Sequence, residues 1–332
     1  YCFGLVRTLQ ILKLRVMKLL SSLNLLCPAC KKALETHSKR EFSCNNKSCK
    51  QYGQVEVLSN HKPVLINFAS SVFSKNALLD SHGKSKLKRN VWSSSLSEII
   101  KLVLNGANNK TKVNLSLVIE ELSKISNPKI LIIGGGSVGV GVDLLYEKFK
   151  NDIVSFDVYD SDYVDFIGDA NNTPFENDVF DFVLIQAVLE HVESPHSVVL
   201  EIYRVLKNKG LVYAETPFLQ HVHEGAYDFT RYTVLGHRML FKDFDKIRIG
   251  FIGGLGQSLL WSIENFAKGL FRSKAVGKGF KLLFFWVRFL ELIIPDAAND
   301  DGACGSFFYG AKKPSNDQKR LIEYLNDYQG NQ

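Results

Sequence analysis

Between residue 129 and about residue 250, short apolar runs alternate with segments in which apolar residues recur at helical spacing. Five of the short runs predict β-strands: Ile130–Ile133, Ile153–Phe156, Asp165–Ile167, Phe182–Ile185 and Leu211–Ala214. Strands that alternate with helices usually pair in parallel and are covered by helices on both faces. We therefore expect an α/β fold built on one doubly wound, mostly parallel sheet.

Helical spacing also marks the segments before this region. Residues 3–23 have a basic face, an apolar face and no acidic residue, which predicts a basic amphipathic helix. Such a helix either packs on its own protein or lies on a membrane surface. Further helices are expected near Ser95–Leu104 and Leu115–Ser126, and Pro128 then marks a boundary.

Two apolar segments follow the alternating region, at residues 256–271 and 280–295. In the second, Lys281, Arg288 and Glu291 form one narrow charged stripe, and nearly all other positions are apolar. The 15 residues before Pro295 are too few to span a bilayer. We expect either a helix buried in the core or one that lies on a membrane or at a dimer interface.

Composition and charge narrow the class of protein. A length of 332 residues allows about two domains, and 45% hydrophobic with 23% charged residues allows a sizeable packed core. The net charge of +7 is spread along the chain, which favours acidic ligands or an anionic membrane over dedicated nucleic-acid binding. Charges interrupt every candidate signal-peptide core, so we expect a cytoplasmic protein, with peripheral membrane association as an alternative.

Six cysteines occur in the chain, and four of them fall within 23 residues as C-x2-C-x13-C-x4-C. These four are Cys27, Cys30, Cys44 and Cys49. Two thiolate pairs on short turns suit a tetrahedral zinc ion, and residues 27–60 resemble a small zinc ribbon. Four protein ligands close the coordination shell, so this zinc is expected to be structural. The alternative is a ribbon that folds without metal.

The first predicted strand leads into a glycine-rich turn. Gly134, Gly136 and Gly139 fit G-x-G-x-x-G, where missing side chains permit a tight turn, close approach by a ligand and close helix packing. Asp157 ends the second strand, 23 residues past Gly134, where a carboxylate can accept hydrogen bonds from both hydroxyls of a ribose. The pattern indicates a nucleoside-bearing cofactor. The alternative for Asp157 is a solvated residue at a strand end.

Two enzyme classes compete for this cofactor site, a nicotinamide dehydrogenase and a methyltransferase. Tyr203 and Lys207 form the Y-x-x-x-K pair that short-chain dehydrogenases use for proton transfer. Here the pair lies only 69 residues past Gly134, which is much too early for that family. The pair also lies within a segment that has a different resemblance.

Residues 168–217 resemble the block that follows the second strand of class I S-adenosylmethionine-dependent methyltransferases. The resemblance rests on an Asp-Ala pair before a Pro-Phe turn, a Phe-Asp at the fourth strand, a Leu-Glu-His-Val after that strand, and an Arg-Val-Leu-Lys helix before a glycine. It implies a Rossmann-like methyltransferase fold over residues 128–250, with S-adenosylmethionine as the cofactor.

The same resemblance implies cofactor contacts for particular residues. The three glycines are expected to cradle the cofactor and Asp157 to bind its ribose. Asp169 is expected to bind the adenine amino group, with Ala170 alongside. Gln186 and Ala187, at the end of the fourth strand, are expected near the methionine part and the transferable methyl group.

The loop after the fifth strand, TPFLQHVHEGAYDFTRYT at residues 216–233, concentrates titratable and aromatic residues. Its candidate catalytic residues are His221, His223, Asp228 and Arg231. A histidine can accept a proton near neutral pH, and an arginine can hold an anion. His191, just past the fourth strand, is a further candidate. A similar loop occurs in methyltransferases of polysaccharide biosynthesis, which implies a glycan or glycolipid acceptor methylated at oxygen. The alternative is a hydrogen-bonded structural loop, with His191 serving helix capping or packing.

The sequence therefore predicts five segments. They are a basic amphipathic helix at residues 1–26, a zinc-ribbon-like module at 27–60, a linker with helices at 61–127, a class I methyltransferase domain at 128–250 and a helical C-terminal addition at 251–332. The predicted function is S-adenosylmethionine-dependent methylation of a small-molecule, glycan or glycolipid acceptor.

Two alternatives to this enzyme stay open. One is a non-catalytic scaffold with a methyltransferase-like fold. It is favoured by Ile132, because many class I members carry an acidic residue two positions before the first glycine, and another group must then contact the methionine ammonium. The other is a nucleic-acid methyltransferase, favoured by the zinc ribbon and the positive charge. Against it, Thr216-Pro217-Phe218 stands after the fifth strand in place of the Asn/Asp-Pro-Pro-aromatic motif of amino-methylating enzymes.

Overall fold

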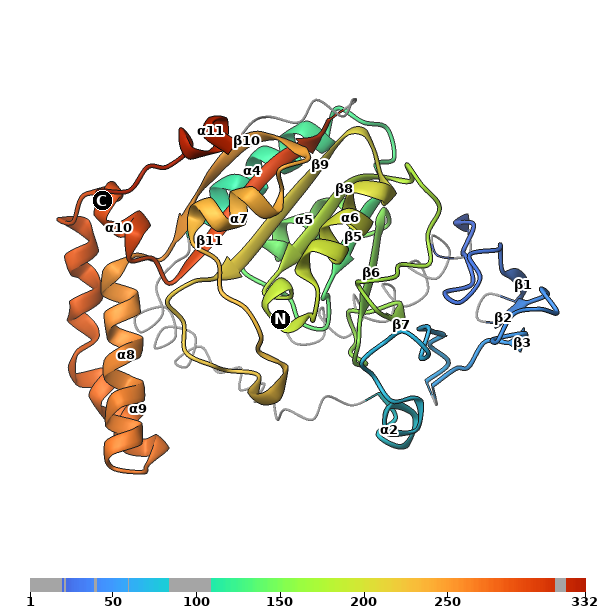
Figure 1. Ribbon diagram of the computed structural model, residues 1–332, viewed down its shortest axis with the longest axis horizontal. Coiled ribbons are helices and arrows are strands. Elements are labelled where there is room, and N and C mark those ends of the chain that lie inside the picture. Colours follow the sequence, from blue (N-terminus) through green and yellow to red (C-terminus); the bar gives the residue numbers. More distant parts are fainter. Residues whose placement is uncertain (1–19, 21, 39–40, 59, 84–108, 314–320) are drawn as a thin grey trace.

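The computed structural model describes residues 20, 22–38, 41–58, 60–83, 109–313 and 321–332 (Figure 1). The helix predicted over residues 3–23 falls almost wholly outside these ranges, and the helix predicted near Ser95–Leu104 falls entirely outside them. The described residues form one three-stranded sheet and one eight-stranded sheet.

The large sheet has the strand order β10-β11-β9-β8-β5-β6-β7-β4. Its parallel strands are β4 (Val64–Leu65), β5 (Ile130–Ile133), β6 (Ile153–Asp157), β7 (Phe166–Gly168), β8 (Phe180–Gln186) and β9 (Leu206–Pro217). The five strands predicted from the apolar runs are β5 to β9. The predicted fold class, a mostly parallel sheet covered by helices with a small N-terminal module, is confirmed.

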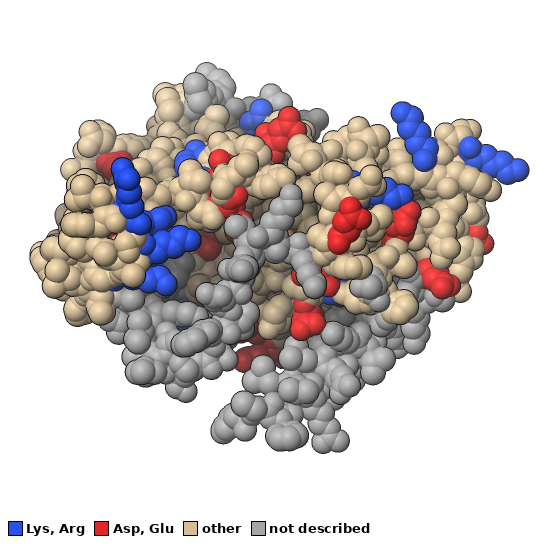
Figure 2. All heavy atoms as spheres, turned by 90° about the horizontal axis from the view of Figure 1, so that it is seen from below, with Lys and Arg blue, Asp and Glu red and all other residues tan. Residues whose placement is uncertain are grey.

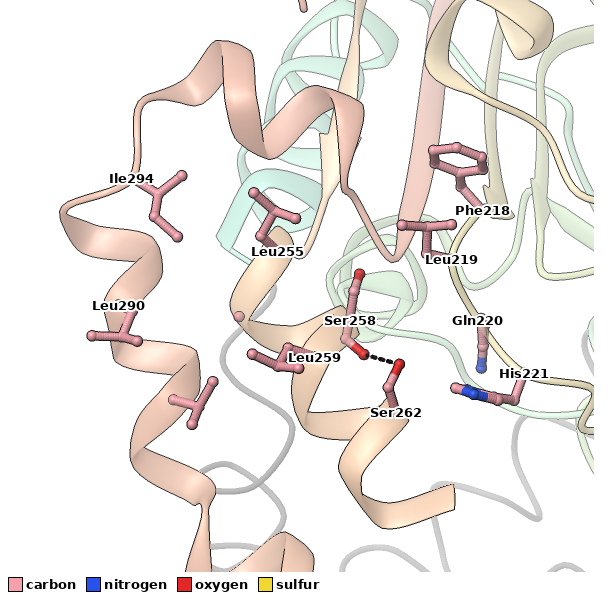
Figure 3. Close-up of a pocket in the computed structure, with 12 residues that line it drawn as sticks. Phe218, Leu219, Gln220, His221, Leu255, Ser258, Leu259, Ser262, Leu290 and Ile294 are labelled. Carbon is pink, nitrogen blue, oxygen red and sulfur yellow. Dashed lines mark hydrogen bonds between the residues drawn. The ribbon is translucent and has the colours of Figure 1, made fainter. Parts of the chain in front are cut away.

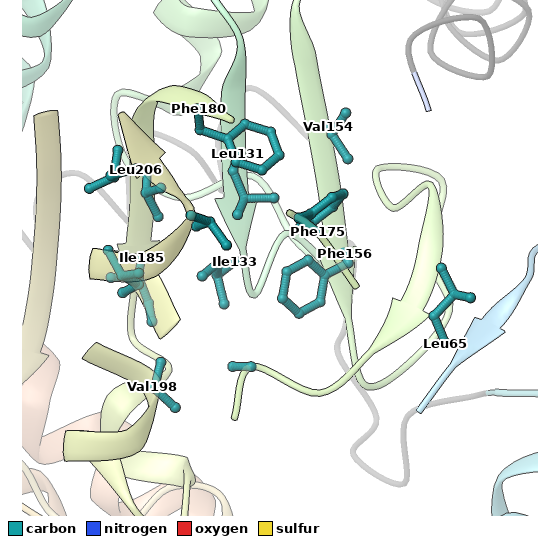
Figure 4. Packing of buried hydrophobic residues seen from close by; sticks show 14 of the residues in the cluster. Leu65, Leu131, Ile133, Val154, Phe156, Phe175, Phe180, Ile185, Val198 and Leu206 are labelled. Carbon is teal, nitrogen blue, oxygen red and sulfur yellow. The ribbon is translucent and has the colours of Figure 1, made fainter. Parts of the chain in front are cut away.

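Strand β5 shows why this sheet is covered on both faces. Leu131 and Ile133 belong to one buried cluster (Figure 4). Ile130 and Ile132 belong to another. Alternate side chains of a strand point to opposite faces, so a strand with four buried apolar residues needs packing on both sides.

Helices supply that packing from both sides. Helices α4 (Asn109–Leu122) and α5 (Val142–Phe149) contribute to the cluster of Ile130 and Ile132. Helix α6 (Pro195–Val205) packs in the opposite cluster. The hydroxyl of Ser194 accepts a hydrogen bond from the amide of Ser197, and Pro195 occupies the first turn, which together fix where α6 begins.

The other edge of the large sheet is antiparallel. Strand β11 (Gly305–Lys312) lies between β9 and β10 (Phe244–Ile252) and runs antiparallel to both. Helix α7 (Val234–Leu240) precedes β10, and α11 (Leu321–Leu325) follows β11. The sheet is therefore completed by a strand from near the C-terminus of the chain.

The cysteine module lies at the β4 end of the large sheet (Figure 1). It contains β1 (Glu35–Ser38), β2 (Glu41–Cys44) and β3 (Gly53–Gln54), and helix α2 (Lys75–Asp80) follows β4. Leu23, Leu25 and Phe42 share a buried cluster with Phe175 of the large domain. The amide of Leu26 donates to the carbonyl of Pro174 at 2.8 Å, so apolar contact and backbone hydrogen bonding both hold the module in place.

A helical hairpin connects β10 to β11 at the opposite end of the sheet (Figure 1). It consists of α8 (Leu255–Leu270), α9 (Lys274–Leu283) and the 3-10 segment η3 (Phe285–Leu292), followed by α10 (Asp296–Asp301). Segment η3 packs on α8 at Gly256, where a side chain would collide with the backbone of Arg288. Among the described helices, none has both the length and the apolar character needed to cross a bilayer.

The expectation of one helix buried in the core at residues 280–295 is wrong. Helix α9 ends at Leu283, and η3 then follows the surface of α8, so tertiary packing sets its direction. Leu283, Leu292 and Ile293 are 65%, 84% and 80% exposed, whereas Val287 is buried against α8. The hairpin therefore presents an apolar surface to solvent, and the membrane and dimer alternatives stay predictions.

Helix α7 buries a histidine, which makes stability depend on pH. His237 is fully buried, its Nδ1 lies 3.1 Å from the hydroxyl of Ser306, and burial lowers its pKa to about 3. In the unfolded chain the imidazole binds a proton below about pH 6.5, while the folded protein does not, so stability falls as pH falls through this window.

We therefore expect the free energy of unfolding to decrease by about 2 kcal/mol between pH 7 and pH 5 because of this residue. Urea unfolding at both pH values measures the effect. His237→Phe should remove about this much of the pH dependence, and His196→Ala, on the exposed side of α6, should leave it unchanged. If the free energy of unfolding changed equally with pH in His237→Phe and in the unmodified protein, this assignment would be contradicted.

Candidate functional site

The loops that follow β5 and β8 meet at the carboxyl edge of the sheet. Strands β5 and β8 are neighbours in the sheet. After β5 the chain passes to β6 on one side, and after β8 it passes to β9 on the other side, so it leaves the two strands in opposite directions. Ligands of doubly wound sheets bind in the crevice at such a point. Gly134, at φ +78°, turns the chain here, and a side chain on it would collide with Val188 of the loop after β8.

The three glycines of the turn each face a side chain of the protein itself. Gly136 lies against the ring of Tyr159, which follows β6, and Gly139 lies against the amide oxygen of Gln186 at the end of β8. The absence of side chains is thus already required by the packing of the turn. A ligand above Gly136 must stack with the Tyr159 ring or displace it.

The two aspartates predicted to bind the cofactor are held firmly. Asp157, 8% exposed, accepts hydrogen bonds from the amides of Gly136 at 2.8 Å and Val158 at 2.7 Å. The Oδ1 atom of Asp169 accepts from the amide and side chain of Asn171, and its Oδ2 atom accepts from the hydroxyl of Ser71 at 2.6 Å. Ala170, beside Asp169, is buried. The carboxylates are therefore fixed in position by hydrogen bonds from the chain itself.

Gln186 and Ala187 end β8 next to a buried carboxylate. Gln186 donates to Glu215 of β9 at 3.1 Å, and Thr111 and the hydroxyl of Tyr213 also donate to Glu215. Burial raises the pKa of Glu215. Ala187 has φ +53°, a left-handed conformation that is uncommon outside glycine. The sequence analysis missed Glu215, whose only signal is its place at the end of the fifth strand.

A second buried carboxylate lies beside two histidines. Glu190, in the 3-10 turn η1 (Leu189–His191), is 1% exposed, and neither of its carboxylate oxygens has a hydrogen-bonding partner within the described residues. The Nε2 atoms of His191 and His223 lie 3.6 Å and 3.9 Å from its Oε1. Burial raises the pKa of Glu190 to about 8 and lowers the pKa of His191. The sequence analysis named both histidines but missed Glu190.

Asp228 and Arg231 hold His223 in this group. The two terminal guanidinium nitrogens of Arg231, Nη1 and Nη2, donate to the carboxylate of Asp228, and the arginine holds the pKa of that carboxyl well below its usual range. The same carboxylate accepts from the amide of His223 at 2.9 Å and lies 3.3 Å from its Nδ1. The amide of Phe229 donates to the carbonyl of Glu190 at 2.8 Å, which ties the loop after β9 to η1.

His221, the remaining candidate of this loop, faces a different space. A cavity of about 570 Å³ separates the start of the loop from the helical hairpin (Figure 3). It is lined mainly by Phe218, Leu219, Leu255, Leu259, Val287, Leu290 and Ile294, with Gln220 and His221 at one side. The structure thus brings His191, His223, Asp228 and Arg231 together and places His221 beside an apolar cavity.

The four predicted zinc ligands form one compact cluster. All four sulfur atoms lie within 4.8 Å of one another. The Sγ atoms of Cys27 and Cys49, and those of Cys30 and Cys44, are 3.7 Å apart. Zinc–sulfur bonds of about 2.3 Å give a tetrahedron with edges of about 3.8 Å, so this donor set fits a zinc ion.

Comparison with known proteins identifies the central part of the chain. Residues 138–214 match the methyltransferase domain family. No curated protein matches the chain. Among solved structures, a candidate sarcosine dimethylglycine methyltransferase of Galdieria sulphuraria is similar at 16% identity and a TM-score of 0.41, covering 61% of this chain and 86% of the other. Phosphoethanolamine N-methyltransferase 2 of Haemonchus contortus, in complex with S-adenosyl-L-methionine, has 16% identity and a TM-score of 0.42, covering 73% and 61%.

These two structural similarities are distant. The family match over residues 138–214 and the doubly wound sheet together confirm the predicted methyltransferase.

Proposed function

We propose that this protein transfers a methyl group from S-adenosylmethionine to an oxygen atom of a glycan or glycolipid acceptor at a membrane surface. The observation that carries the proposal is the contact between Gly134 and Val188. It places the glycine turn, where the cofactor is expected, directly against the segment that bears Glu190 and His191. The glycine turn at residues 134–139 and the group formed by Glu190, His191 and His223 are therefore neighbours at one edge of the sheet.

The residues around the turn fit the parts of S-adenosylmethionine. Asp157 can accept from the ribose hydroxyls, and Asp169 can accept from the adenine amino group. The acidic group that Ile132 does not supply is present in Glu215, which lies beside Gln186 at the same edge. We assign the methionine ammonium to this pair.

The proton of the acceptor hydroxyl must also be removed. Bound S-adenosylmethionine supplies a methyl group on a positively charged sulfur, which the acceptor oxygen takes as the carbon–sulfur electron pair stays on sulfur and the hydroxyl proton leaves. His191 and His223 lie beside the buried Glu190, and Asp228 fixes the ring of His223. We assign the handling of this proton to the group formed by Glu190, His191 and His223.

His223→Ala and His191→Ala are each expected to lower turnover by about 10²–10⁴-fold, the usual contribution of positioned acid–base groups. Cofactor affinity should stay unchanged, because the side chains nearest the glycines are Val188, Tyr159 and Gln186 and not these histidines. Transfer of radiolabelled methyl groups to cell-extract fractions measures turnover, and calorimetry measures affinity. His196→Ala serves as the matched histidine control. Full activity in both variants would show that His191 and His223 do not take part in the reaction.

The apolar cavity and the hairpin support a lipid-linked acceptor. The cavity beside His221 can bury an apolar chain, and the hairpin that forms its other wall is apolar outside as well. Exposed apolar residues there include Phe266, Leu270, Leu283, Trp286, Leu292 and Ile293. Exposed basic residues there are Lys268, Arg272, Lys274 and Lys278. Figure 2 shows Lys and Arg side chains gathered at this end of the molecule. Apolar and basic residues together suit an anionic membrane surface.

We expect the protein to sediment with vesicles that contain anionic lipid and to bind neutral vesicles weakly. Leu292→Glu combined with Ile293→Glu should lower vesicle binding at least about tenfold, since burying one such side chain contributes roughly 1.5–3 kcal/mol. Val113→Glu with Leu117→Glu, on the exposed face of α4, is the matched control. Equal sedimentation of both double variants would argue against the hairpin as the contact.

One observation favours the alternative of a non-catalytic scaffold. The Tyr159 ring lies against Gly136, in the space where a cofactor would approach the turn. The enzyme needs this ring to move or to stack on the ligand, whereas a scaffold does not. Cofactor binding by the purified protein separates the two functions.

We further propose that Cys27, Cys30, Cys44 and Cys49 hold a structural zinc ion. The sulfur spacing supports this assignment, and four thiolates leave no position for a substrate.

A further inference from the structure

The buried carboxylate of Glu190 lacks the compensation that a charged group needs. Burying an unpaired carboxylate is costly, so such a group normally keeps a proton, meets a donor or binds a cation. No donor reaches either of its oxygens from the described residues. The Nε2 atoms of His191 and His223 lie 3.6 Å and 3.9 Å from its Oε1.

Hydrogen bonding fixes where each imidazole carries its proton. The Nδ1 atom of His191 lies 2.6 Å from the carbonyl oxygen of Tyr227. A carbonyl can only accept, so Nδ1 carries the hydrogen and Nε2 carries a lone pair. The Nδ1 atom of His223 faces the carboxylate of Asp228 and the carbonyl of His221, both at 3.3 Å and both acceptors. Its Nε2 atom therefore also carries a lone pair.

Two imidazole lone pairs and one carboxyl group thus converge, and no other described residue donates a hydrogen bond to that carboxyl group. The three ligand atoms lie within 4.8 Å of one another. Ligand bonds of about 2.0–2.2 Å around a tetrahedral ion place the ligand atoms about 3.3–3.6 Å apart. The observed separations of 3.6 Å and 3.9 Å need only a small contraction. His223 belongs to a loop, which can make that adjustment.

We propose that Glu190, His191 and His223 bind one divalent transition-metal ion, for which Zn²⁺ is the best chemical match. Two histidines and one glutamate are a donor set that zinc accepts with a fourth position left open. The groups behind the ligands agree with this assignment. Metal-binding histidines usually donate their other N–H to a carbonyl or carboxylate, as His191 does to Tyr227 and as the approach of His223 to Asp228 provides.

The role of this metal in catalysis rests on the proposed function, whereas metal binding itself does not. A hydroxyl of the acceptor fits the open position. The metal lowers the pKa of that hydroxyl, its proton passes to water, and the oxygen keeps the electron pair that forms the new bond to carbon. With the ion bound, the histidines act as ligands; the acid–base role assigned to them above applies to the metal-free site.

Zinc content of the full-length protein tests the site. Protein stripped with a chelator, loaded with Zn²⁺ and dialysed should hold two zinc ions per chain, one at the cysteines and one here. His223→Ala and Glu190→Gln should each hold one. His196→Ala should hold two. Since His223 lies at the surface, its removal should leave the fold intact, which circular dichroism checks.

The outcomes separate the site from the reaction. A wild-type protein that holds only the cysteine-bound zinc at micromolar Zn²⁺ overturns the proposal, and so does unchanged zinc content in both His223→Ala and Glu190→Gln. Loss of one zinc in these two variants supports it whether or not methyl transfer is found. If turnover falls in His223→Ala while the wild type never holds a second zinc, methyl transfer stands and the metal site does not.

Discussion

Replacement of Asp157 by alanine is expected to weaken S-adenosylmethionine binding by about two to three orders of magnitude. Two losses combine in this variant. The ribose hydroxyls lose a charged acceptor, at about 1.5–3 kcal/mol for each such hydrogen bond, and a factor of ten in affinity corresponds to about 1.4 kcal/mol. The amide of Gly136 also loses the carboxylate that now holds the glycine turn.

Calorimetry with S-adenosylmethionine and with its demethylated product measures the effect. Asp157→Asn keeps the size of the side chain and one acceptor oxygen, so its affinity should be intermediate. Asp162→Ala, five residues along on an exposed position, should bind as the unmodified protein does. Thermal unfolding of each variant shows whether the fold is retained. Absence of binding by the unmodified protein at millimolar ligand would reject the cofactor site and favour the scaffold with Tyr159 closed over Gly136.

Replacement of Cys44 by serine is expected to release the cysteine-bound zinc and to unfold the N-terminal module. Binding energy at a structural zinc site is folding energy, so loss of one ligand should destabilise the module by several kcal/mol. The module has only short strands of its own, and much of its apolar surface, such as Leu25 and Phe42, is buried against the large domain. Without zinc, the chain between the two cysteine pairs keeps only the short β1–β2 pairing and the packing of residues such as Phe42.

Elemental analysis and limited proteolysis test this expectation. Cys44→Ser should hold one zinc fewer per chain, and proteases should cut within residues 22–58. Cys304→Ala is the matched control, because Cys304 is buried next to β11 and outside the cluster. It should keep the full zinc content. A Cys44→Ser protein with the zinc content and protease resistance of the unmodified chain would show that the ribbon folds without metal.

The parallel half of the sheet was predictable because each strand carries its own signal. Strands β5 to β8 are buried on both faces, so they appear as continuous apolar runs between helices. The antiparallel edge carries no such signal. Strand β10 is largely exposed along its middle, and β11 pairs with β9 across about ninety residues of intervening chain.

The residues of the candidate site likewise fall into those that the sequence could predict and those that it could not. His191, His223, Asp228 and Arg231 could be named from residue type and position, and the structure does bring them together. Glu190 could not be chosen, because its importance depends on being buried without a donor, and burial is a property of the packed structure. The exposed hairpin was misjudged for the same reason, since an apolar sequence does not say whether a partner surface exists.

The sequence by itself determined the features that depend on neighbours along the chain: the strand–turn–helix around Gly134, the carboxylate that ends β6, and two cysteine pairs with zinc-like spacing. Only the tertiary structure decided which distant groups meet. It set the Tyr159 ring against Gly136 and His223 beside Glu190, 33 positions earlier in the chain. Short-range order follows from local backbone geometry and side-chain size. Contacts between residues that are distant in the sequence depend on how the whole chain packs.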